Sequence, residues 1–470
     1  MNLQLAAATM VTAAALVLAS PPAWVVGLVL LVVVLPLGVV LAFRVEPGLV
    51  LALGLAGSVF SGYAGRIGLP IGPDRVLVPL ALALLVCGGP LGSPDRPKLR
   101  WRAVHGWMLV TVGIVVVLGV AAGSFVGKRG FFALLDRLGI VPFLAFALAP
   151  LLFSSARQRS HLLVVLVGVG WYLGLTGLLE GFGYRDLVWP SYINDPSVGL
   201  HFFRARGPFV ESSALGVSLL GSLGAAVIAM QVWRSRASKW AARLLVPVLL
   251  LAAVFTLTRA VWLAAAAAGL VGIAATPRLR RAFLPILLVS AVSVAAALAL
   301  VPGLGDSVSQ RRAERIAVWD RLNTNAAAID AVRANPLTGI GWARFRDEST
   351  RYLDQQASYP LTGETIEVHN VLLSRLAEIG LLGTIPLLVT MVLGLVVPAL
   401  APTKPELRPW RLGLLIYGAA FAVVSMFGPN PGAFPNLLLW LLAGIVATPA
   451  TTWGPDRDEV EVPSVAVAAV

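Results

Sequence analysis

The chain has 470 residues, of which 58% are hydrophobic and 13% are charged, and its formal net charge is +13. Charged residues make up about a quarter of an ordinary soluble domain, so this composition excludes a soluble globular protein. It predicts a chain that crosses a membrane many times. The single cysteine, Cys87, excludes an intramolecular disulfide and a cysteine-based metal cluster.

Apolar runs recur from end to end, each close to the roughly 20 residues that a membrane-spanning helix needs. They exclude a transmembrane β-barrel and predict an all-α polytopic membrane protein. We expect fourteen spans, at residues 3–19, 23–43, 47–63, 71–89, 105–123, 137–153, 161–179, 212–232, 244–257, 260–276, 282–302, 377–400, 412–428 and 435–449. Prolines punctuate the first four spans, and only Thr258 and Arg259 separate the ninth from the tenth, so twelve or thirteen spans are the alternative.

Basic residues cluster in five short loops between the expected spans. They are Arg96, Lys98, Arg100 and Arg102; Arg157 and Arg159; Arg234, Arg236, Lys239 and Arg243; Arg278, Arg280 and Arg281; and Lys404, Arg408 and Arg411. Cytoplasmic loops are enriched in Lys and Arg, so we expect these loops, both termini and the acidic tail at 450–470 to face the cytoplasm. The first eleven helices then occupy residues 1–302, and the last three occupy 377–449.

The long connections, at 180–211 and 303–376, are expected on the extracytoplasmic side, where we look for the functional site. Arg259 is expected near that side, between two apolar runs with no room for a solvated loop. An unpaired charge in such a place costs several kcal/mol, so the side chain either snorkels to the headgroups or faces a cavity as an anion site. We favour the anion site.

Two of the four histidines, His201 and His369, are also expected on the extracytoplasmic side. His369 stands where a polar loop gives way to an apolar helix, and Glu364 and Glu367 precede it. Histidine is the usual general base near neutral pH, although a single interfacial histidine is also common as a structural residue.

The connection at 303–376 contains an expected amphipathic helix over residues 309–334. Its apolar stripe consists of Ile316, Trp319, Leu322, Ala326 and Ile329. We expect this stripe, which includes Trp319, to lie over the membrane domain. Asn335 and Pro336 end the helix, and a glycine-rich turn, LTGIGW, follows.

Four stretches together resemble the superfamily of O-antigen ligases and O-antigen polymerases, which are bacterial membrane glycosyltransferases. They are RGPFVESSALGVSLL (206–220), TLTRAVWLA (256–264), ERIAVWDRLNTNAAAIDAVRANPLTGIGWARF (314–345) and HNVLLSRLAEIGLLG (369–383). They occur in the order found in that family, whereas the first 200 residues resemble it only in being hydrophobic.

The resemblance implies a fold of the type termed GT-C, with about twelve or more membrane helices and one large extracytoplasmic loop. It also implies transfer of a glycan from an undecaprenyl-diphosphate-type lipid to an acceptor hydroxyl, without a metal or cofactor and with inversion at the anomeric carbon. The protein would then reside in the bacterial inner membrane, act on the polysaccharides of the cell envelope, and contact a lipid-linked donor, a lipid or glycan acceptor and the bilayer.

The same resemblance implies roles for individual residues. Arg259 would bind the diphosphate and His369 would be the base, while Arg315 corresponds to an arginine of the loop helix. Either Arg204 or Arg206 could correspond to the arginine near the Gly-Pro-Phe motif.

Glycan transfer from a lipid diphosphate requires residues of these types. Guanidinium groups bind phosphate oxygens bidentately, and an imidazole can accept the proton of the acceptor hydroxyl. Glu364 or Glu367 could orient that imidazole. We expect a ligase, with a polymerase of surface polysaccharide as the alternative, and the motifs do not separate these two. A flippase or transporter of lipid-linked glycans is the alternative from another functional class, although no internal repeat supports it.

Overall fold

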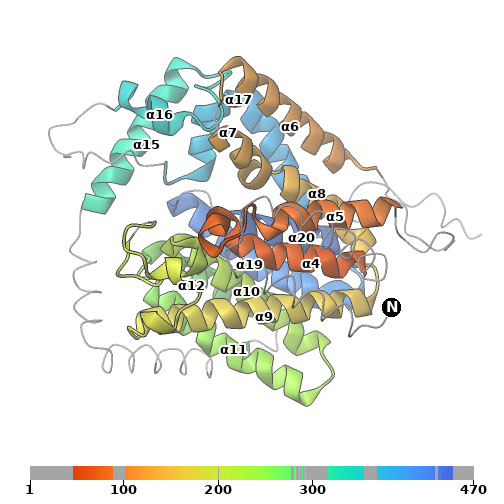
Figure 1. The fold of residues 1–470 in the computed structure, drawn as a ribbon. Coiled ribbons are helices and arrows are strands. Elements are labelled where there is room, and N and C mark those ends of the chain that lie inside the picture. The colour runs from red at the N-terminus through yellow and green to blue at the C-terminus, as the bar shows by residue number, and fades with distance from the viewer. Residues whose placement is uncertain are drawn as a thin grey trace, which may run out of the picture.

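The computed structural model describes residues 46–87, 101–126, 128–199, 201–276, 280, 281, 285, 288, 292, 316–353, 368–428 and 432–447. Within these ranges every regular element is a helix or helical turn (Figure 1). The first half contains α4 (Pro47–Gly57), η2 (Ser58–Ile67), α5 (Pro73–Cys87), α6 (Ala103–Ala121), α7 (Lys128–Phe132), η3 (Ala133–Leu138), α8 (Ile140–Leu152), α9 (Ala156–Gly181), η4 (Arg185–Leu187), η5 (Ser191–Asn194), η6 (Gly207–Phe209) and α10 (Ser212–Val232). The second half contains α11 (Arg236–Phe255), α12 (Arg259–Ala275), α15 (Ile316–Ala334), α16 (Phe345–Glu348), η7 (Ser349–Arg351), α17 (Val371–Met391), η8 (Val392–Val396), α18 (Val397–Leu400), η9 (Pro405–Leu407), α19 (Arg408–Phe427) and α20 (Ala433–Val446).

Eight helical runs of the described chain are long and apolar enough to cross a membrane. They are Pro47–Ile67, Ala103–Ala121, Arg129–Leu152, Ala156–Gly181, Ser212–Val232, Arg236–Phe255, Val371–Leu400 and Pro405–Phe427. These runs confirm the all-α polytopic fold. The expected spans 3–19 and 23–43 lie outside the described residues, and 282–302 lies almost wholly outside them. Each of the other expected spans coincides with a helix, with α5, α12 and α20 as shorter ones.

Helix α10 occupies the centre of the bundle and is buried along nearly its whole length. It packs against α9, α11 and α19. Small residues permit this close packing, as they do between membrane helices generally. A Cβ atom at Gly221, for example, would lie 2.8 Å from the Leu438 side chain. The hydroxyl of Tyr417 donates a hydrogen bond to the carbonyl of Pro435 at 2.8 Å, which joins α19 to α20 beside α10.

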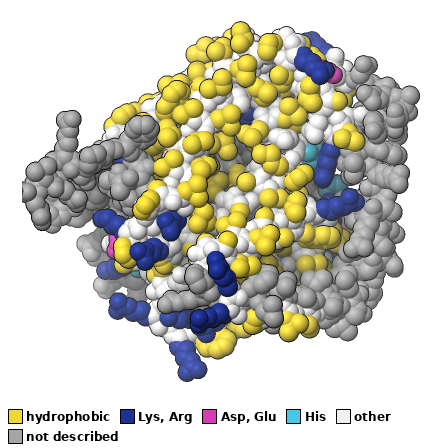
Figure 2. Space-filling model, turned by 180° about the vertical axis from the view of Figure 1, so that it is seen from behind, with side chains coloured by type: hydrophobic (Ala, Val, Ile, Leu, Met, Phe, Trp, Pro, Cys, Tyr) yellow, Lys and Arg dark blue, Asp and Glu magenta, His cyan; other side chains and the backbone are white. Residues whose placement is uncertain are grey.

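The bundle has two different ends. At one end, which we call the loop face, α9 and α11 finish, α10 and α12 begin, and the connection 182–211 is folded. At the opposite end, which we call the basic face, lie the short basic loops, and His161 pairs with Glu46 at 3.0 Å. In Figure 2 hydrophobic side chains cover the middle of the molecule, and most Lys and Arg side chains gather toward its margins. This is the distribution that a bilayer favours.

Helix α17 is broken at Gly380, whose φ and ψ are 58° and −166°. The turn after α15 lies alongside the break and satisfies its backbone groups. Ile340 and Gly341 donate hydrogen bonds to the carbonyls of Ala377 and Glu378, at 2.9 and 3.0 Å. Leu381 and Leu382 donate in return to the carbonyls of Pro336 and Leu337, at 2.9 and 3.0 Å. The connection is thereby fixed to the first turns of a membrane helix.

Helix α15 ends at Ala334, as the Asn335–Pro336 signal predicts, but its expected apolar stripe is wrong at the three members whose side chains are described, Leu322, Ala326 and Ile329. Leu322 and Ile329 are exposed, with 47% and 42% of their surfaces accessible. The buried face consists instead of Asn323, Thr324, Ala327, Ala328 and Ala331. Alanine is small enough to let α15 approach α17 closely. The contact face of α15 therefore consists of small side chains, whereas the helical periodicity predicted a face of large ones.

Candidate functional site at the loop face

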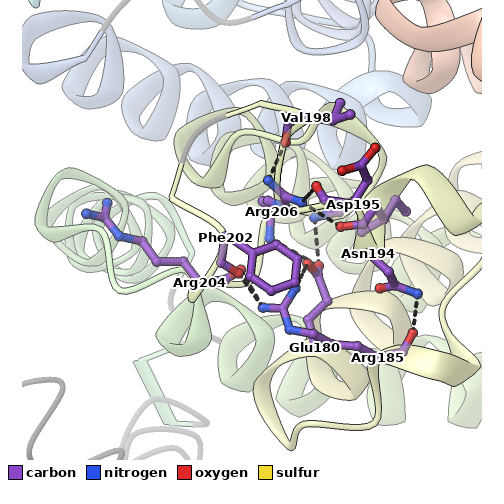
Figure 3. Close-up of polar contacts among 10 residues, drawn as sticks. Glu180, Arg185, Asn194, Asp195, Val198, Phe202, Arg204 and Arg206 are labelled. Atoms are coloured by element: carbon purple, nitrogen blue, oxygen red, sulfur yellow. Dashed lines mark hydrogen bonds and ion pairs between the residues drawn. The ribbon is translucent and has the colours of Figure 1, made fainter. Parts of the chain in front are cut away.

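The connection 182–211 is folded around the buried carboxylate of Glu180, near the end of α9 (Figure 3). Its Oε2 atom accepts hydrogen bonds from the backbone N–H groups of Arg206, at 3.1 Å, and Gly207, at 2.7 Å. Its Oε1 atom lies 3.4 Å from the guanidinium of Arg185. A buried carboxylate persists only when it is paired in this way, so Glu180 sets the conformation of the Gly-Pro-Phe motif.

The side chain of Arg206 is inside this loop and fully buried. Its Nη2 atom donates hydrogen bonds to the carbonyls of Ile193, at 2.8 Å, and Asp195, at 2.7 Å, and Nη1 donates to the carbonyl of Val198. Burial lowers the pKa of this guanidinium, and the charge of Glu180 opposes that effect. Arg206 therefore holds three loop carbonyls together and does not present its terminal nitrogens to an open site.

Arg204 lies two residues earlier but points away from this cluster (Figure 3). Its carbonyl accepts a hydrogen bond from Arg185 at 3.2 Å, and the N–H of Ala205 donates to the carbonyl of Phe255 at 2.9 Å. The second bond ties the loop to the end of α11. The structure thus separates two arginines that the sequence could not distinguish.

Arg259 is the first residue of α12 and is exposed at the loop face. The turn before it is tight, with a φ of 48° at Leu257. The hydroxyl of Thr258 donates to the carbonyl of Thr256 at 2.9 Å and lies 3.1 Å from the hydroxyl of Ser212 on α10. These contacts fix the turn that places Arg259 at the N-terminus of α12, where the helix dipole also favours an anion.

A second guanidinium, that of Arg321 on α15, lies within electrostatic reach of Arg259. Burial lowers the pKa of Arg321, and the positive charge of Arg259 lowers it further. The Nε atom of Arg321 is buried and has no hydrogen-bond partner among the described residues. The positive charges of Arg259 on α12 and Arg321 on α15 repel each other. An anion bound between the two guanidinium groups would offset this repulsion.

His369 lies next to the same helix. It is half-buried and precedes α17, whose N-cap residue Asn370 accepts a hydrogen bond from the N–H of Leu373 at 3.0 Å. The preceding residue, Val368, is buried in a cluster with Ala327, Ala328 and Ala331 of α15. Helix α15 therefore contacts the residue beside the imidazole and also carries Arg321, whose pKa the charge of Arg259 lowers.

A hollow of about 640 Å³ with a mixed polar and apolar lining opens beside the Gly-Pro-Phe motif. Its lining includes Pro208 and Phe209 from the motif, Glu211 two residues after it, and Tyr63 from η2. Arg75 and Asp136, which form an ion pair, lie on another wall. Aromatic rings and hydrogen-bonding groups therefore line the same hollow.

Several of the expected site residues cannot be placed. Arg315, Glu364 and Glu367 lie outside the described residues, and Trp319 belongs to α15 through its backbone but its side chain is not described. Sequence reasoning did not select Arg321 as a site residue. A signal was present, because Arg321 lies on the same expected helix six residues after Arg315, but periodicity alone does not show which of several arginines faces a neighbouring element.

Part of the chain is similar to a known family of proteins. No curated protein sequence matches the chain. A family model described as O-antigen ligase matches residues 244–388. This range contains α12 with Arg259, α15 with Arg321, and the first part of α17 with His369 before it. Over this segment the chain is similar to the O-antigen ligase family.

Proposed function

We propose that the protein is a glycosyltransferase of the extracytoplasmic membrane face, which moves a glycan from a polyprenyl-diphosphate-linked donor to an acceptor hydroxyl. One observation carries the proposal, the convergence of Arg259, Arg321 and the segment of His369 around α15. Positive charge and a proton acceptor are the two things that such a transfer requires.

In the proposed reaction the acceptor hydroxyl attacks the anomeric carbon on the side opposite to the diphosphate. The bond from that carbon to the diphosphate oxygen breaks, and its electron pair leaves with the oxygen. Arg259 and Arg321 bind the diphosphate as its negative charge increases, and Arg204 is a third candidate for this role. His369 takes the hydroxyl proton. A single displacement of this kind inverts the anomeric configuration.

The proposal is tested with purified protein, a polyprenyl-diphosphate-linked glycan and candidate acceptors. We expect Arg259→Ala and His369→Ala each to lower the rate of transfer by a factor on the order of 10² or more, because general-base and charge-stabilising groups contribute that much. Both variants should insert and unfold like the unmodified protein. Full activity in either variant would remove that residue from the mechanism.

The product decides between the two forms of the enzyme. A longer glycan on the lipid indicates a polymerase, whereas a conjugate with a different acceptor indicates a ligase. Movement of the lipid-linked glycan across the bilayer without a new glycosidic bond would contradict the proposal.

A further inference from the structure

The start of α11 carries a group of cations that the proposed reaction does not use. Arg234 precedes the helix, and Arg236, Lys239 and Arg243 lie on its first turns; we call these four residues the α11 cluster. The three arginines are exposed and Lys239 is half-buried. Because α11 ends at the loop face, its start and the cluster lie on the basic face. In Figure 2 Lys and Arg side chains gather at the lower left margin, the side of the basic face.

Arg236, Lys239 and Arg243 share one face of α11, because side chains three, four and seven positions apart lie on the same side of a helix. Trp240 belongs to this face, whereas Leu245 on the opposite face is buried in the bundle. The Cζ atom of Arg243 lies 5.0 Å from the centre of the Trp240 ring, three residues earlier. The guanidinium is therefore directed toward the start of the helix. Three cationic groups are concentrated within roughly 10 Å of helix.

No carboxylate of the described chain balances the α11 cluster. The segment 231–244 contains neither Asp nor Glu. None of the four cations forms an ion pair or a side-chain hydrogen bond among the described residues. Two carboxylates at the same end of the bundle are paired elsewhere, Glu406 with Arg159 at 3.7 Å and Glu46 with His161 at 3.0 Å. Because the like charges of the cluster repel one another, the cluster is complementary to an anion.

The cationic face of α11 becomes apolar after Arg243. Leu244, Pro247 and Leu251 continue it at helical spacing, and Leu244 is 56% exposed. The whole helix is long and apolar enough to cross a membrane. Tryptophan beside Lys and Arg at the end of such a helix is typical of headgroup depth, and the long stems of the cations reach toward that level. An anionic phospholipid has the same order, a phosphate followed by acyl chains, whereas a soluble anion matches only the first part.

We propose that the α11 cluster binds an anionic phospholipid of the leaflet at the basic face. Arg236, Lys239 and Arg243 contact its phosphate, because cations and phosphate oxygens form charge-assisted hydrogen bonds. The ring of Trp240 positions Arg243, and the acyl chains lie along the apolar continuation of the same face from Leu244. The site is at the opposite end of the bundle from the proposed transfer site, so the inference does not depend on the proposed function.

Two triple variants of equal charge test the site. The cluster variant carries Arg236→Gln, Lys239→Gln and Arg243→Gln. The control variant replaces three exposed arginines outside the cluster, each of which already pairs with a carboxylate. These are Arg66→Gln, Arg333→Gln and Arg351→Gln, whose partners are Asp195, Asp330 and Glu348. Both variants lose three positive charges, so a difference between them reports on the place of the charges and not on the net charge.

The probe is photoreactive phosphatidylglycerol, present at a low mole fraction in phosphatidylcholine nanodiscs that hold the full-length protein. Mass spectrometry of the peptides measures labelling of the segment 234–251. We expect the cluster variant to lose labelling on the order of tenfold or more, because each Lys or Arg beside an anionic headgroup strengthens binding severalfold. The control variant should label like the unmodified protein. Undiminished labelling of the cluster variant, or an equal loss in the control variant, would overturn the proposal.

Two further probes identify the ligand. Photoreactive phosphatidylcholine should label the segment 234–251 at least tenfold less than the anionic probe, and equal labelling by the two lipids would mean ordinary contact with the bilayer and overturn the proposal. Soluble pyrophosphate should not displace the anionic probe at physiological ionic strength. If it competes as well as unlabelled phosphatidylglycerol, the cluster binds a soluble anion and the lipid assignment is wrong.

Trp240→Leu tests the positioning of Arg243. This variant keeps an apolar side chain but removes the ring beneath the guanidinium, so we expect labelling to fall about threefold, as loss of a cation–π contact predicts. Trp107→Leu is the control, because Trp107 is an exposed tryptophan of α6 with no cation over its ring among the described residues. Equal labelling of the two variants would overturn the role assigned to Trp240.

Discussion

Arg204 and Arg206 are two residues apart, yet they lie in different surroundings. The fully buried Arg206 donates to the carbonyls of Ile193, Asp195 and Val198, while Arg204 points away from that cluster (Figure 3). Spacing along the chain could not separate them, because the direction of each side chain depends on the irregular loop that Glu180 holds.

We expect Arg206→Ala to lower the free energy of unfolding by about 3 kcal/mol, because three carbonyls lose a charged donor and Glu180 loses a neighbouring positive charge. Arg204→Ala should leave stability within about 0.5 kcal/mol, as is usual away from buried networks, and reduce transfer. Thermal unfolding in detergent and transfer rate per folded molecule measure the two effects. The reverse pattern would exchange the roles assigned to these residues.

Charge at the site is expected to come from arginine, so transfer should not depend on a divalent cation. Arg259 and Arg321 lie close enough for one charge to lower the pKa of the other, and a diphosphate bound there would be neutralised by the protein itself. We expect full activity in EDTA. Activity that is lost in EDTA and restored by Mg²⁺ or Mn²⁺ would contradict the arginine mechanism.

Helices α15 and α17 are the elements that assemble the site. The end of α15 at Ala334 follows from Asn335 and Pro336, and the start of α17 follows from its N-cap residue, Asn370. The break at Gly380 and the alanine contact face of α15 did not follow from local signals. Both depend on the close approach of the two helices.

Gly380→Ala tests that arrangement. The φ of 58° with a ψ of −166° is accessible almost only to glycine, and a Cβ atom would lie 2.2 Å from the carbonyl oxygen of Leu337. We expect a loss of stability on the order of 3 kcal/mol and release of the 336–341 turn. Hydrogen exchange of that turn measures the release.

The matched control is Gly168→Ala, at an open helical position, which should raise stability by less than about 1 kcal/mol. If Gly380→Ala behaves like this control, the turn does not depend on the break in α17.

At the scale of the whole molecule, the helices form a bundle with a loop face and a basic face. The long connections and the proposed site share the loop face, and the short basic loops lie opposite. Because Lys and Arg favour the cytoplasmic side, we expect the loop face to be extracytoplasmic and both termini to be cytoplasmic.

Labelling of intact cells tests this orientation. After replacement of the single cysteine by Cys87→Ser, we expect a membrane-impermeant maleimide to label Ser191→Cys in the exposed loop and not Ala237→Cys at the opposite face. Ala237→Cys should react once the cells are opened. Labelling of Ala237→Cys alone in intact cells would reverse the topology and the proposed side of transfer.

The sequence by itself determined the all-α membrane fold, the positions of most spans, the end of α15 and the likeness to O-antigen ligases, because hydrophobic length and capping residues act locally. Only the tertiary structure decided that Arg206 is buried within its loop and that Arg321 lies within electrostatic reach of Arg259. Guanidinium groups on different helices are brought together by packing between those helices, and no local pattern in the chain encodes that approach.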